Sequence, residues 1–145
     1  MSASIWKQAP RLDELNHRLE GSLGGLLGMR FVELGDDFLR ASMPVGPKTW
    51  QPDHRLHGGA SVALAEEVGS TASNYCLDRT RERAVGLEIN ASHLRGITEG
   101  NLVATARPLR IGRTTHVWDV RIESEPGRLI CTVRLTTAII AKTDS

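Results

Sequence analysis

A stretch of 26 residues from Gln51 to Cys76 constrains the fold of this chain more than any other part of the sequence. It opens as a polar loop, passes through His57-Gly58-Gly59, and continues as a run of small and apolar residues broken only by Glu66 and Glu67. Glycines are poor inside a helix but suit its start. A helix that is apolar on nearly all sides is buried. We therefore predict one buried helix from Gly58 to about Cys76, ~28 Å long.

The remaining segments carry the alternating patterns and turn signals of strands, except near the N-terminus. There, leucines at helical spacing predict a short amphipathic helix over Arg11–Glu20, and Ser22–Gly28 is either a further helical turn or a loop. The predicted strands are Met29–Leu34 and Phe38–Met43, which form a hairpin, and then Arg83–Ser92, Asn101–Ile111, Thr114–Ser124 and Arg128–Ala141.

Local features refine three of these strands. Pro44 is expected to end the second strand, and Pro108 predicts a bulge or a sheet edge. Simple alternation along Arg83–Ser92 places one apolar set on a single face of that strand. The members of this set are Val85, Leu87, Ile89 and Ala91.

The order of elements predicts an α+β protein in which a long central helix is wrapped by a curved antiparallel sheet of about six strands, the hotdog arrangement. We expect residues 1–145 to form one domain, with a loose arm at 1–10 and a polar tail at 142–145. Several strands are apolar on both faces, and one helix can cover only one face. The excess therefore predicts burial against another subunit.

Composition excludes several classes of function. The formal net charge of +1 gives no global attraction to nucleic acid or an anionic membrane. No apolar run reaches the roughly 18 residues of a spanning helix, and the first ten residues lack the apolar core of a secretory signal. Cys76 and Cys131 fit no metal spacing, so we expect no metal or other cofactor and interpret both as buried thiols in a reducing cytoplasm.

The central stretch also contains reactive groups. A buried carboxylate is costly unless it has strong partners or a purpose. Glu66 is followed four residues later by Ser70 on the same helical face, and the glycines at the helix start expose backbone N–H groups that favour an oxyanion. With Gln51 nearby, this set suits attack on an activated acyl carbonyl. The alternative is a Glu66 held by hydrogen bonds or an ion pair in the core.

The run from Gln51 through HGGASVALAE to Ser70 resembles the signature of hotdog-fold acyl-CoA thioesterases. It is most similar to the 4-hydroxybenzoyl-CoA thioesterase branch, which includes enzymes acting on 1,4-dihydroxy-2-naphthoyl-CoA and on aryl carrier-protein thioesters, within the phenylacetate-pathway thioesterase superfamily. The resemblance continues through GDDFLRASMPV, VGLEINASHLRG, IGRTTHVWDV and RLTTAII. It implies hydrolysis of an aromatic or medium-chain acyl-CoA, or of a carrier-protein thioester, by a dimer of dimers with its sites at the dimer interface.

The resemblance also implies residue roles. Glu66 matches the catalytic nucleophile or general base, and Gly58 the residue whose N–H polarises the thioester carbonyl. Gln51 matches a side chain that positions the thioester, His57 one that orders the loop, and Ser70 a hydroxyl that assists water or the acyl group. The residues expected to contact the acyl group or CoA are His93, Arg95, Arg110, Arg113, Thr114 and Gly86.

One segment departs from this pattern. Asp53-His54-Arg55 is bulky and charged where the family has a small or apolar segment, and we expect it at the mouth of the site. Two other functions remain open for such a chain. A hotdog dehydratase would release an enoyl thioester, and a non-catalytic acyl-CoA-binding protein would release no thiol.

Overall fold

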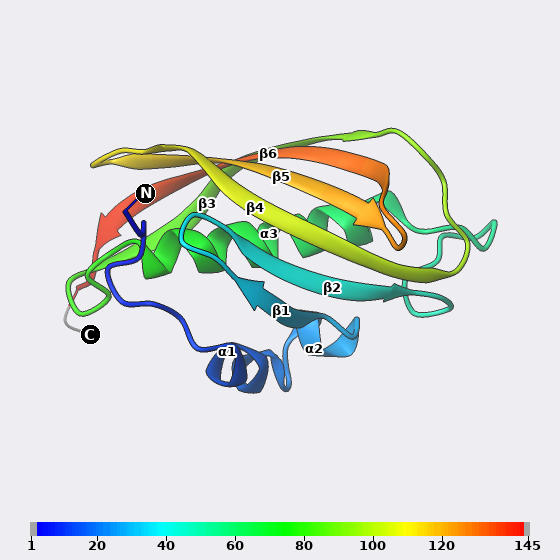
Figure 1. Ribbon diagram of the computed structural model, residues 1–145, viewed down its shortest axis with the longest axis horizontal. Helices are drawn as coiled ribbons and strands as arrows, with labels where there is room; N and C mark the ends of the chain where they lie inside the picture. Colours follow the sequence, from blue (N-terminus) through cyan, green and yellow to red (C-terminus); the bar gives the residue numbers. More distant parts are fainter. Residues whose placement is uncertain (1–2, 144–145) are drawn as a thin grey trace.

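One long helix organises the computed structural model, which describes residues 3–143. This helix, α3 (Gly58–Tyr75), lies under a six-stranded antiparallel sheet that curves over it (Figure 1). Two short helices, α1 (Leu12–Leu19) and α2 (Leu23–Leu26), precede the sheet. The strands are β1 (Arg30–Leu34), β2 (Leu39–Val45), β3 (Glu82–His93), β4 (Gly100–Ile111), β5 (Thr115–Ser124) and β6 (Arg128–Ala141). The predicted hotdog arrangement is therefore confirmed.

The burial of α3 follows from its sequence. Leu64, Ala65, Val68 and Ala72 are fully buried on the side that faces the sheet. Small residues between them let the strands approach closely, so the helix fits inside the curve of the sheet. The opposing strands supply the fully buried side chains of Trp118, Val120, Ile122 and Leu135.

The strand order is β1-β2-β4-β5-β6-β3. The hairpins β1–β2, β4–β5 and β5–β6 are local, as adjacent antiparallel strands predict. β3 instead pairs with the last strand, β6, because residues 94–99 carry the chain from β3 across to β4 on the other side of the sheet. β3 is consequently an edge strand with one side unpaired in the described chain.

A bulge in β3 overturns the predicted alternation of its apolar side chains. Gly86 pairs with Thr137 and Glu88 with Thr136, so Leu87 is the extra residue and points to solvent with 64% of its surface exposed. A bulge shifts the alternation by one position. The inward side chains are therefore Ala84 before the bulge, and Ile89 and Ala91 after it.

The two prolines have different outcomes. The bulge or edge predicted at Pro108 is confirmed, because the β4–β5 register shifts between Pro108 and Arg110. The expectation that Pro44 ends its strand is wrong, since β2 continues through Pro44 to Val45. β1 begins opposite Ser42, so beyond that point one edge of β2 has no neighbour and a missing N–H there breaks no ladder bond.

The N-terminal arm is fastened to the body of the protein where it is described. Ile5 N–H donates to Asp36 O at 3.0 Å, Lys7 N–H donates to Tyr75 O at 3.0 Å, and the Trp6 indole N–H donates to Gly35 O at 2.8 Å. Residues 1–2 of the predicted arm and 144–145 of the predicted tail lie outside the described residues.

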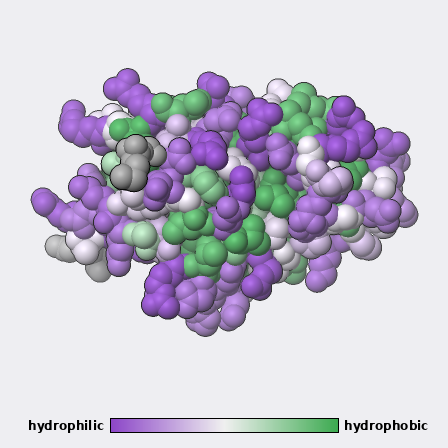
Figure 2. Space-filling model, viewed as in Figure 1, coloured by the Kyte–Doolittle hydropathy of each residue, from purple (hydrophilic) through white to green (hydrophobic). Residues whose placement is uncertain are grey.

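Apolar side chains also reach the surface. Leu23 and Leu26 of α2 and Leu94 after β3 are more than half exposed. Figure 2 shows apolar patches on one face of the molecule, each bordered by polar side chains. None of the helices within residues 3–143 has the length and hydropathy needed to cross a membrane.

Candidate active site

The N-terminus of α3 presents one free backbone donor. His57 is the N-cap, and its Nδ1 accepts a hydrogen bond from Gly59 N–H at 2.8 Å. The N–H of Ala60 donates to His57 O at 3.0 Å. Gly58 N–H meets no acceptor among residues 3–143. The cap therefore satisfies the neighbours of Gly58 and leaves its own N–H for a ligand.

The loop before α3 is folded back on itself. Gln51 N–H donates to Arg55 O at 2.7 Å, and the Gln51 side-chain oxygen accepts a hydrogen bond from Asp53 N–H. His54 adopts a left-handed backbone conformation, with φ of 61°, and its ring stacks on Trp50 at 4.8 Å between centroids. Asp53, His54 and Arg55 are exposed, as expected for residues at the mouth of a site.

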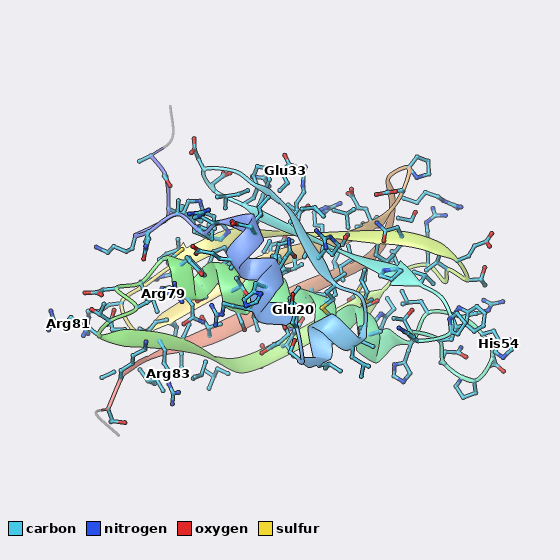
Figure 3. All side chains as sticks on the ribbon, turned by 90° about the horizontal axis from the view of Figure 1, so that it is seen from below. Glu20, Glu33, His54, Arg79, Arg81 and Arg83 are labelled. Atoms are coloured by element: carbon cyan, nitrogen blue, oxygen red, sulfur yellow. The ribbon has the colours of Figure 1, made fainter. Side chains whose placement is uncertain are left out.

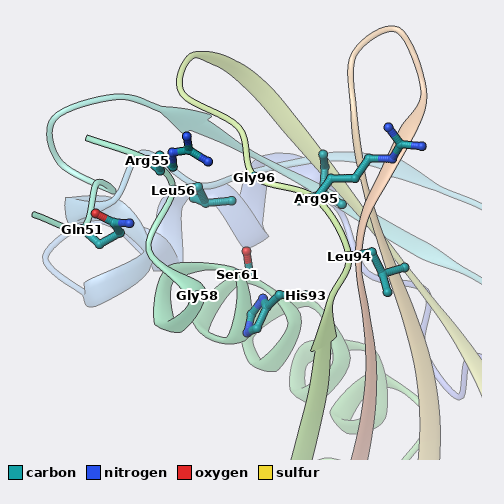
Figure 4. A pocket seen from close by; sticks show the side chains of 10 residues that line it. Gln51, Arg55, Leu56, Gly58, Ser61, His93, Leu94, Arg95 and Gly96 are labelled. Carbon is teal, nitrogen blue, oxygen red and sulfur yellow. The ribbon is translucent and has the colours of Figure 1, made fainter. Parts of the chain in front are cut away.

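A first cavity of about 380 Å³ lies between this loop, the start of α3 and the end of β3 (Figure 4). It brings together four of the predicted site residues: Gln51, Gly58, His93 and Arg95. His57 does not line it and acts beside it through the cap. The other lining residues are Arg55, Leu56, Ser61, Leu94, Gly96 and Ile130.

Ser61 is a lining residue that the sequence analysis missed. Ser61 is fully buried, and its hydroxyl has no hydrogen-bond partner within residues 3–143. Figure 4 shows the hydroxyl pointing away from α3 into the space below Leu56, with His93 beside it. Leaving a buried hydroxyl unpaired costs about 1–3 kcal/mol. Ser61 follows Gly58 by three residues, which places the two on one face of the helix. This spacing in the sequence could have predicted Ser61 as a site residue.

His93 lies against Gly58 and has a partner on the neighbouring strand. A β-carbon added at Gly58 would stand 3.0 Å from His93 Nε2, so a larger residue there would displace the ring by a few tenths of an ångström. The other ring nitrogen, Nδ1, lies 3.6 Å from Cys131 Sγ. Burial raises the pKa of the Cys131 thiol, so Cys131 is a neutral partner of the imidazole rather than a thiolate nucleophile.

Glu66 faces the edge strand. A β-carbon added at Gly86 would lie 3.3 Å from Glu66 Cδ and would overlap its Oε1. Glycine at position 86 therefore makes the space that the carboxylate occupies against β3. Glu66 is half-buried, and no hydrogen bond or ion pair joins its carboxylate to another side chain in residues 3–143. Within the described residues, Glu66 is therefore not neutralised by an ion pair in the core, which was the alternative considered from the sequence.

Glu67 faces the opposite way, toward the N-terminal helices. A β-carbon at Gly24 of α2 would lie 3.5 Å from Glu67 Oε2. Burial raises the pKa of the Glu67 carboxyl, the positive charge of Arg18 opposes that rise, and the Glu66 charge adds to it. Glu67 also lines a small cavity of about 120 Å³ beneath α1. The two adjacent carboxylates therefore lie on different sides of α3, as their spacing of about 100° requires.

A second cavity of about 420 Å³ lies between the C-terminal half of α3 and the start of β3. Of the predicted site residues it contains Ser70. Four cationic side chains and one carboxylate share this cavity with it. The other lining residues are Arg18, Thr71, Asn74, Tyr75, Arg79, Glu82, Arg83, Ala84, Val85 and Lys142. Figure 3 shows Arg79, Arg81 and Arg83 together at one end of the molecule and His54 at the opposite end.

The last predicted residues lie on the β4–β5 hairpin. Arg110 and Arg113 are exposed and Thr114 O accepts a hydrogen bond from Ile139 N–H at 2.9 Å. None of the three lines either cavity. Thr115 pairs with Ala138, which pairs with Val85, so the hairpin stands level with the second cavity and away from Arg95 of its own chain.

Gly58 and Glu66 do not meet within one chain. They are separated by eight residues of helix, which is about 12 Å along its axis. The chain therefore carries two half-sites, one with backbone and imidazole groups at the start of α3 and one with a carboxylate and a hydroxyl further along. Among residues 3–143 no cluster of three His, Cys, Asp or Glu side chains could hold a metal ion.

Comparison with known proteins gives consistent results. Residues 54–131 match the thioesterase superfamily. The 1,4-dihydroxy-2-naphthoyl-CoA hydrolase of Escherichia coli is 48% identical over 136 residues, covering 94% of this chain and 99% of that protein. The proofreading thioesterase EntH of Cronobacter turicensis is 45% identical, covering 94% of this chain and 98% of that protein.

Solved structures agree in fold. A crystal structure of a mutant thioesterase from Pseudomonas aeruginosa has a TM-score of 0.95 and 49% sequence identity, and covers 96% of this chain and 100% of that chain. A thioesterase from Haemophilus influenzae has a TM-score of 0.93 and 41% identity, with 97% of each chain covered.

Proposed function

This chain belongs to the thioesterase superfamily and hydrolyses thioesters, and from that premise we propose that it converts an aromatic or medium-chain acyl-CoA to the free acid and CoA. The name of the Escherichia coli relative supports an aromatic acyl-CoA such as 1,4-dihydroxy-2-naphthoyl-CoA. The name of EntH supports a second candidate, a carrier-protein thioester. Hydrolysis sets aside the two alternatives considered from the sequence, a dehydratase and a non-catalytic acyl-CoA-binding protein.

The observation that carries the proposal is the free Gly58 N–H at the start of a buried helix. The thioester carbonyl oxygen gains negative charge when it is attacked, and a backbone donor at a helix N-terminus stabilises that charge. His57 holds the first turn of the helix through Gly59, so the Gly58 N–H is oriented before substrate arrives. Gln51 and His93 line the same cavity and position the thioester there.

Glu66 supplies the second requirement, which is attack on the carbonyl carbon. Its carboxylate either adds to the carbon and expels the CoA thiolate to give an anhydride, or takes a proton from water as the water adds. The Ser70 hydroxyl, one turn further along α3, assists the water or the acyl group. Single-turnover hydrolysis in ¹⁸O-water separates the two routes, because label in Glu66 would exclude the general-base route.

Since the two half-sites of one chain stand about 12 Å apart along α3, we propose that the working site combines two copies. β3 has an unpaired edge along which a second β3 can add in antiparallel fashion. The first cavity contains His93, at the end of β3, and the second contains residues from its start. Antiparallel pairing places the end of one β3 beside the start of the other, so each first cavity meets a second cavity of the other copy.

The same pairing accounts for the residues expected to bind CoA. It brings the β4–β5 hairpin of one copy to the level of Arg95 of the other. Arg95 from one side, and Arg110, Arg113 and Thr114 from the other, then flank the path of the CoA phosphates. Arginine is well suited to bidentate phosphate contacts. We propose a homotetramer, as a dimer of dimers of single-domain chains (1–145), located in the cytoplasm, where the free thiols of Cys76 and Cys131 stay reduced.

Thiol release from a panel of benzoyl-, naphthoyl-, phenylacetyl- and fatty acyl-CoAs tests the proposed activity. We expect the highest kcat/KM within the aromatic or medium-chain members. If carrier-protein thioesters were hydrolysed and none of the acyl-CoAs were, the second candidate would replace the first.

Complementation tests the shared site. Glu66→Gln and Gly58→Pro are each expected to inactivate the protein. A dimer of one chain of each kind carries one site with both defects and one intact site, so randomly mixed dimers should recover about a quarter of the wild-type activity. No recovery on co-expression, or a monomer by light scattering, would contradict the two-copy site.

A further inference from the structure

His93 ends the edge strand β3 directly opposite Cys131 of β6. Directly opposed side chains of an antiparallel pair lie on the same face of the sheet, with their β-carbons roughly 5 Å apart. That face is the one covered by α3, since Cys131 is fully buried. Leu94 N–H donates to Ile130 O at 2.8 Å and continues the pairing past His93. The sheet therefore fixes the backbone that carries both the imidazole and the thiol.

The contact between these two side chains favours one arrangement of protons. Cys131 Sγ lies 3.6 Å from His93 Nδ1, and burial keeps the thiol protonated because it raises the thiol pKa. An imidazole nitrogen is a good acceptor, whereas a thiol sulfur accepts only weakly. The other acceptor near the thiol, Thr132 O, is more distant at 3.8 Å. The thiol therefore donates to Nδ1, which leaves the ring proton of the neutral imidazole on Nε2.

The Nε2 side of the ring faces the start of α3. A β-carbon lies about 2.5 Å from its own backbone nitrogen, and one added at Gly58 would stand 3.0 Å from His93 Nε2, so Gly58 N and His93 Nε2 are at most about 5.5 Å apart. An oxygen that accepts two hydrogen bonds of about 2.9 Å can join nitrogens up to about 5.8 Å apart. The Gly58 N–H and the His93 Nε2–H can therefore share one acceptor.

A third polar group stands on the same wall of the first cavity. Ser61 is fully buried, its hydroxyl has no partner within residues 3–143, and Figure 4 shows it beside the His93 ring. Buried hydroxyls are nearly always paired. The wall around Gly58 is therefore built to meet a polar group of a ligand, and this observation is independent of the contact between His93 and Cys131.

We propose that Cys131 is a positioning residue, whose S–H holds the His93 ring so that Nε2–H donates to the thioester oxygen beside the Gly58 N–H. The inference rests on the proposed function, because it takes the thioester oxygen to lie at Gly58. The proton stays on Nε2 throughout, and the hydrogen bond strengthens as the oxygen gains negative charge. Cys131 does not touch the substrate, so its effect on the rate passes through His93.

Kinetics of Cys131 variants of the full-length protein test this role. Loss of a group that orients a functional histidine costs about 10–100-fold where it has been measured at metal sites, and a thiol is a weak donor. Cys131→Ala should therefore lower kcat about tenfold and change KM by less than about threefold, because the affected bond strengthens in the transition state. Cys131→Ser keeps a donor and should lose less. Cys76→Ala, at the other buried thiol, is the matched control and should keep the wild-type kcat.

Two further measurements distinguish positioning from a general loss of structure. ¹⁵N NMR of histidine-labelled protein at about pH 8.5, above the usual titration range of an imidazole, reports which ring nitrogen carries the proton. The His93 resonances are assigned by their absence from His93→Gln. The wild type should show the Nε2–H form, and Cys131→Ala a mixture of the two neutral forms. In the His93→Gln background, Cys131→Ala should lower kcat no further, because two residues that act through one group are not additive.

The outcomes separate this inference from the proposed function. An Nδ1–H form in the wild type, an unchanged kcat of Cys131→Ala, or the same tenfold loss in the His93→Gln background would overturn the positioning role and leave thioester hydrolysis standing. Cys131→Val, which fills the space without a donor, replaces Cys131→Ala if that variant does not fold. No hydrolysis of any thioester by the wild type would overturn the proposed function and the donation to the thioester oxygen with it, while the NMR spectra would still report the contact of Cys131 with His93.

Discussion

Glu66 and Glu67 are neighbours on one helix, yet they meet two different regions of the molecule. On one side of α3, Glu66 lies against Gly86 of a strand whose outer edge is unpaired. On the other side, Glu67 lies beneath α1 and beside α2, and the positive charge of Arg18 lowers the pKa of its carboxyl. One carboxylate faces a surface that another molecule can complete, and the other faces a surface that the chain itself has closed.

The difference teaches that burial alone does not identify a catalytic carboxylate. Burial raises the pKa of Glu67, which is the sign often used to find functional acids. Within residues 3–143, Glu67 nevertheless has no helix N-terminus beside it and lines only a small cavity of about 120 Å³. Glu66 has the open edge strand, the Ser70 hydroxyl one turn away and, in the proposed dimer, the Gly58 N–H of the second copy. The catalytic role of a carboxylate is therefore decided by the donors and cavities near it, not by its burial alone.

The largest expected effect comes from replacing each of the two carboxylates in turn. Glu66→Gln should lower kcat by about 10³-fold or more, because it removes the attacking group while keeping its shape. Glu67→Gln is the matched control and should retain activity within about threefold. Thiol release at saturating acyl-CoA measures both. Full activity of Glu66→Gln would remove Glu66 from the mechanism.

The second prediction tests the donor that Glu66 is proposed to work with. Gly58 is the first residue of α3, a position where proline is well tolerated. Gly58→Pro removes the N–H without disturbing the helix and should lower kcat by about 10²–10³-fold. Gly58→Ala adds a similar β-carbon near His93 but keeps the N–H, so it should lose far less. An equal loss in both variants would point to crowding of His93 rather than to the missing donor.

The third prediction sharpens the contrast by moving Glu66 without removing it. Gly86→Val places a β-carbon where Glu66 Oε1 now lies, and should lower kcat by about 10²-fold because small displacements of a reacting group are costly. Gly46→Ala is the control, since a β-carbon there has open space around it. The circular dichroism spectra of both variants should match the wild type, and unchanged activity of Gly86→Val would separate Gly86 from the site.

The smallest expected effect concerns stability on the closed side. Because the pKa of Glu67 is raised in the folded protein, the folded state binds its proton more tightly than the unfolded state, and stability falls as pH rises through this range. Glu67→Gln should therefore raise the Tm at pH 7 by about 1–2 °C, a small shift because the carboxyl remains partly in water. The gain should shrink toward pH 4. A lower Tm of the variant at pH 7 would mean that the Arg18 attraction outweighs burial.

The sequence predicted the parts of this molecule whose cause is local. The apolar run after Gly58 specified α3, and alternation specified β5 and β6. The bulge at Leu87 was not predictable from alternation. The sequence of β3 alternates regularly, and the shift in side-chain direction arises only when the strand pairs with β6. Pro44 was misjudged for a similar reason, since its effect depends on where β1 begins.

The candidate site divides in the same way. The grouping of Gln51, His57 and Gly58 is local and was predicted. The contact of His93 with Cys131, and the gathering of Arg18, Arg79, Arg83 and Lys142 in one cavity, join residues far apart in the sequence. Such contacts follow from the crossover of β3 to the far edge of the sheet, which no local pattern encodes.

That crossover also sets the order in which the protein can be completed during synthesis. β3 has its neighbour in β6, about 35 residues further along the chain from the end of β3, so β6 must leave the ribosome before the sheet can hold Gly86 beside α3. Pairings between distant segments form late and slowly. A nascent or truncated chain that lacks β6 therefore holds Glu66 without the strand that orients it, and we expect hydrolysis only after β6 has paired with β3.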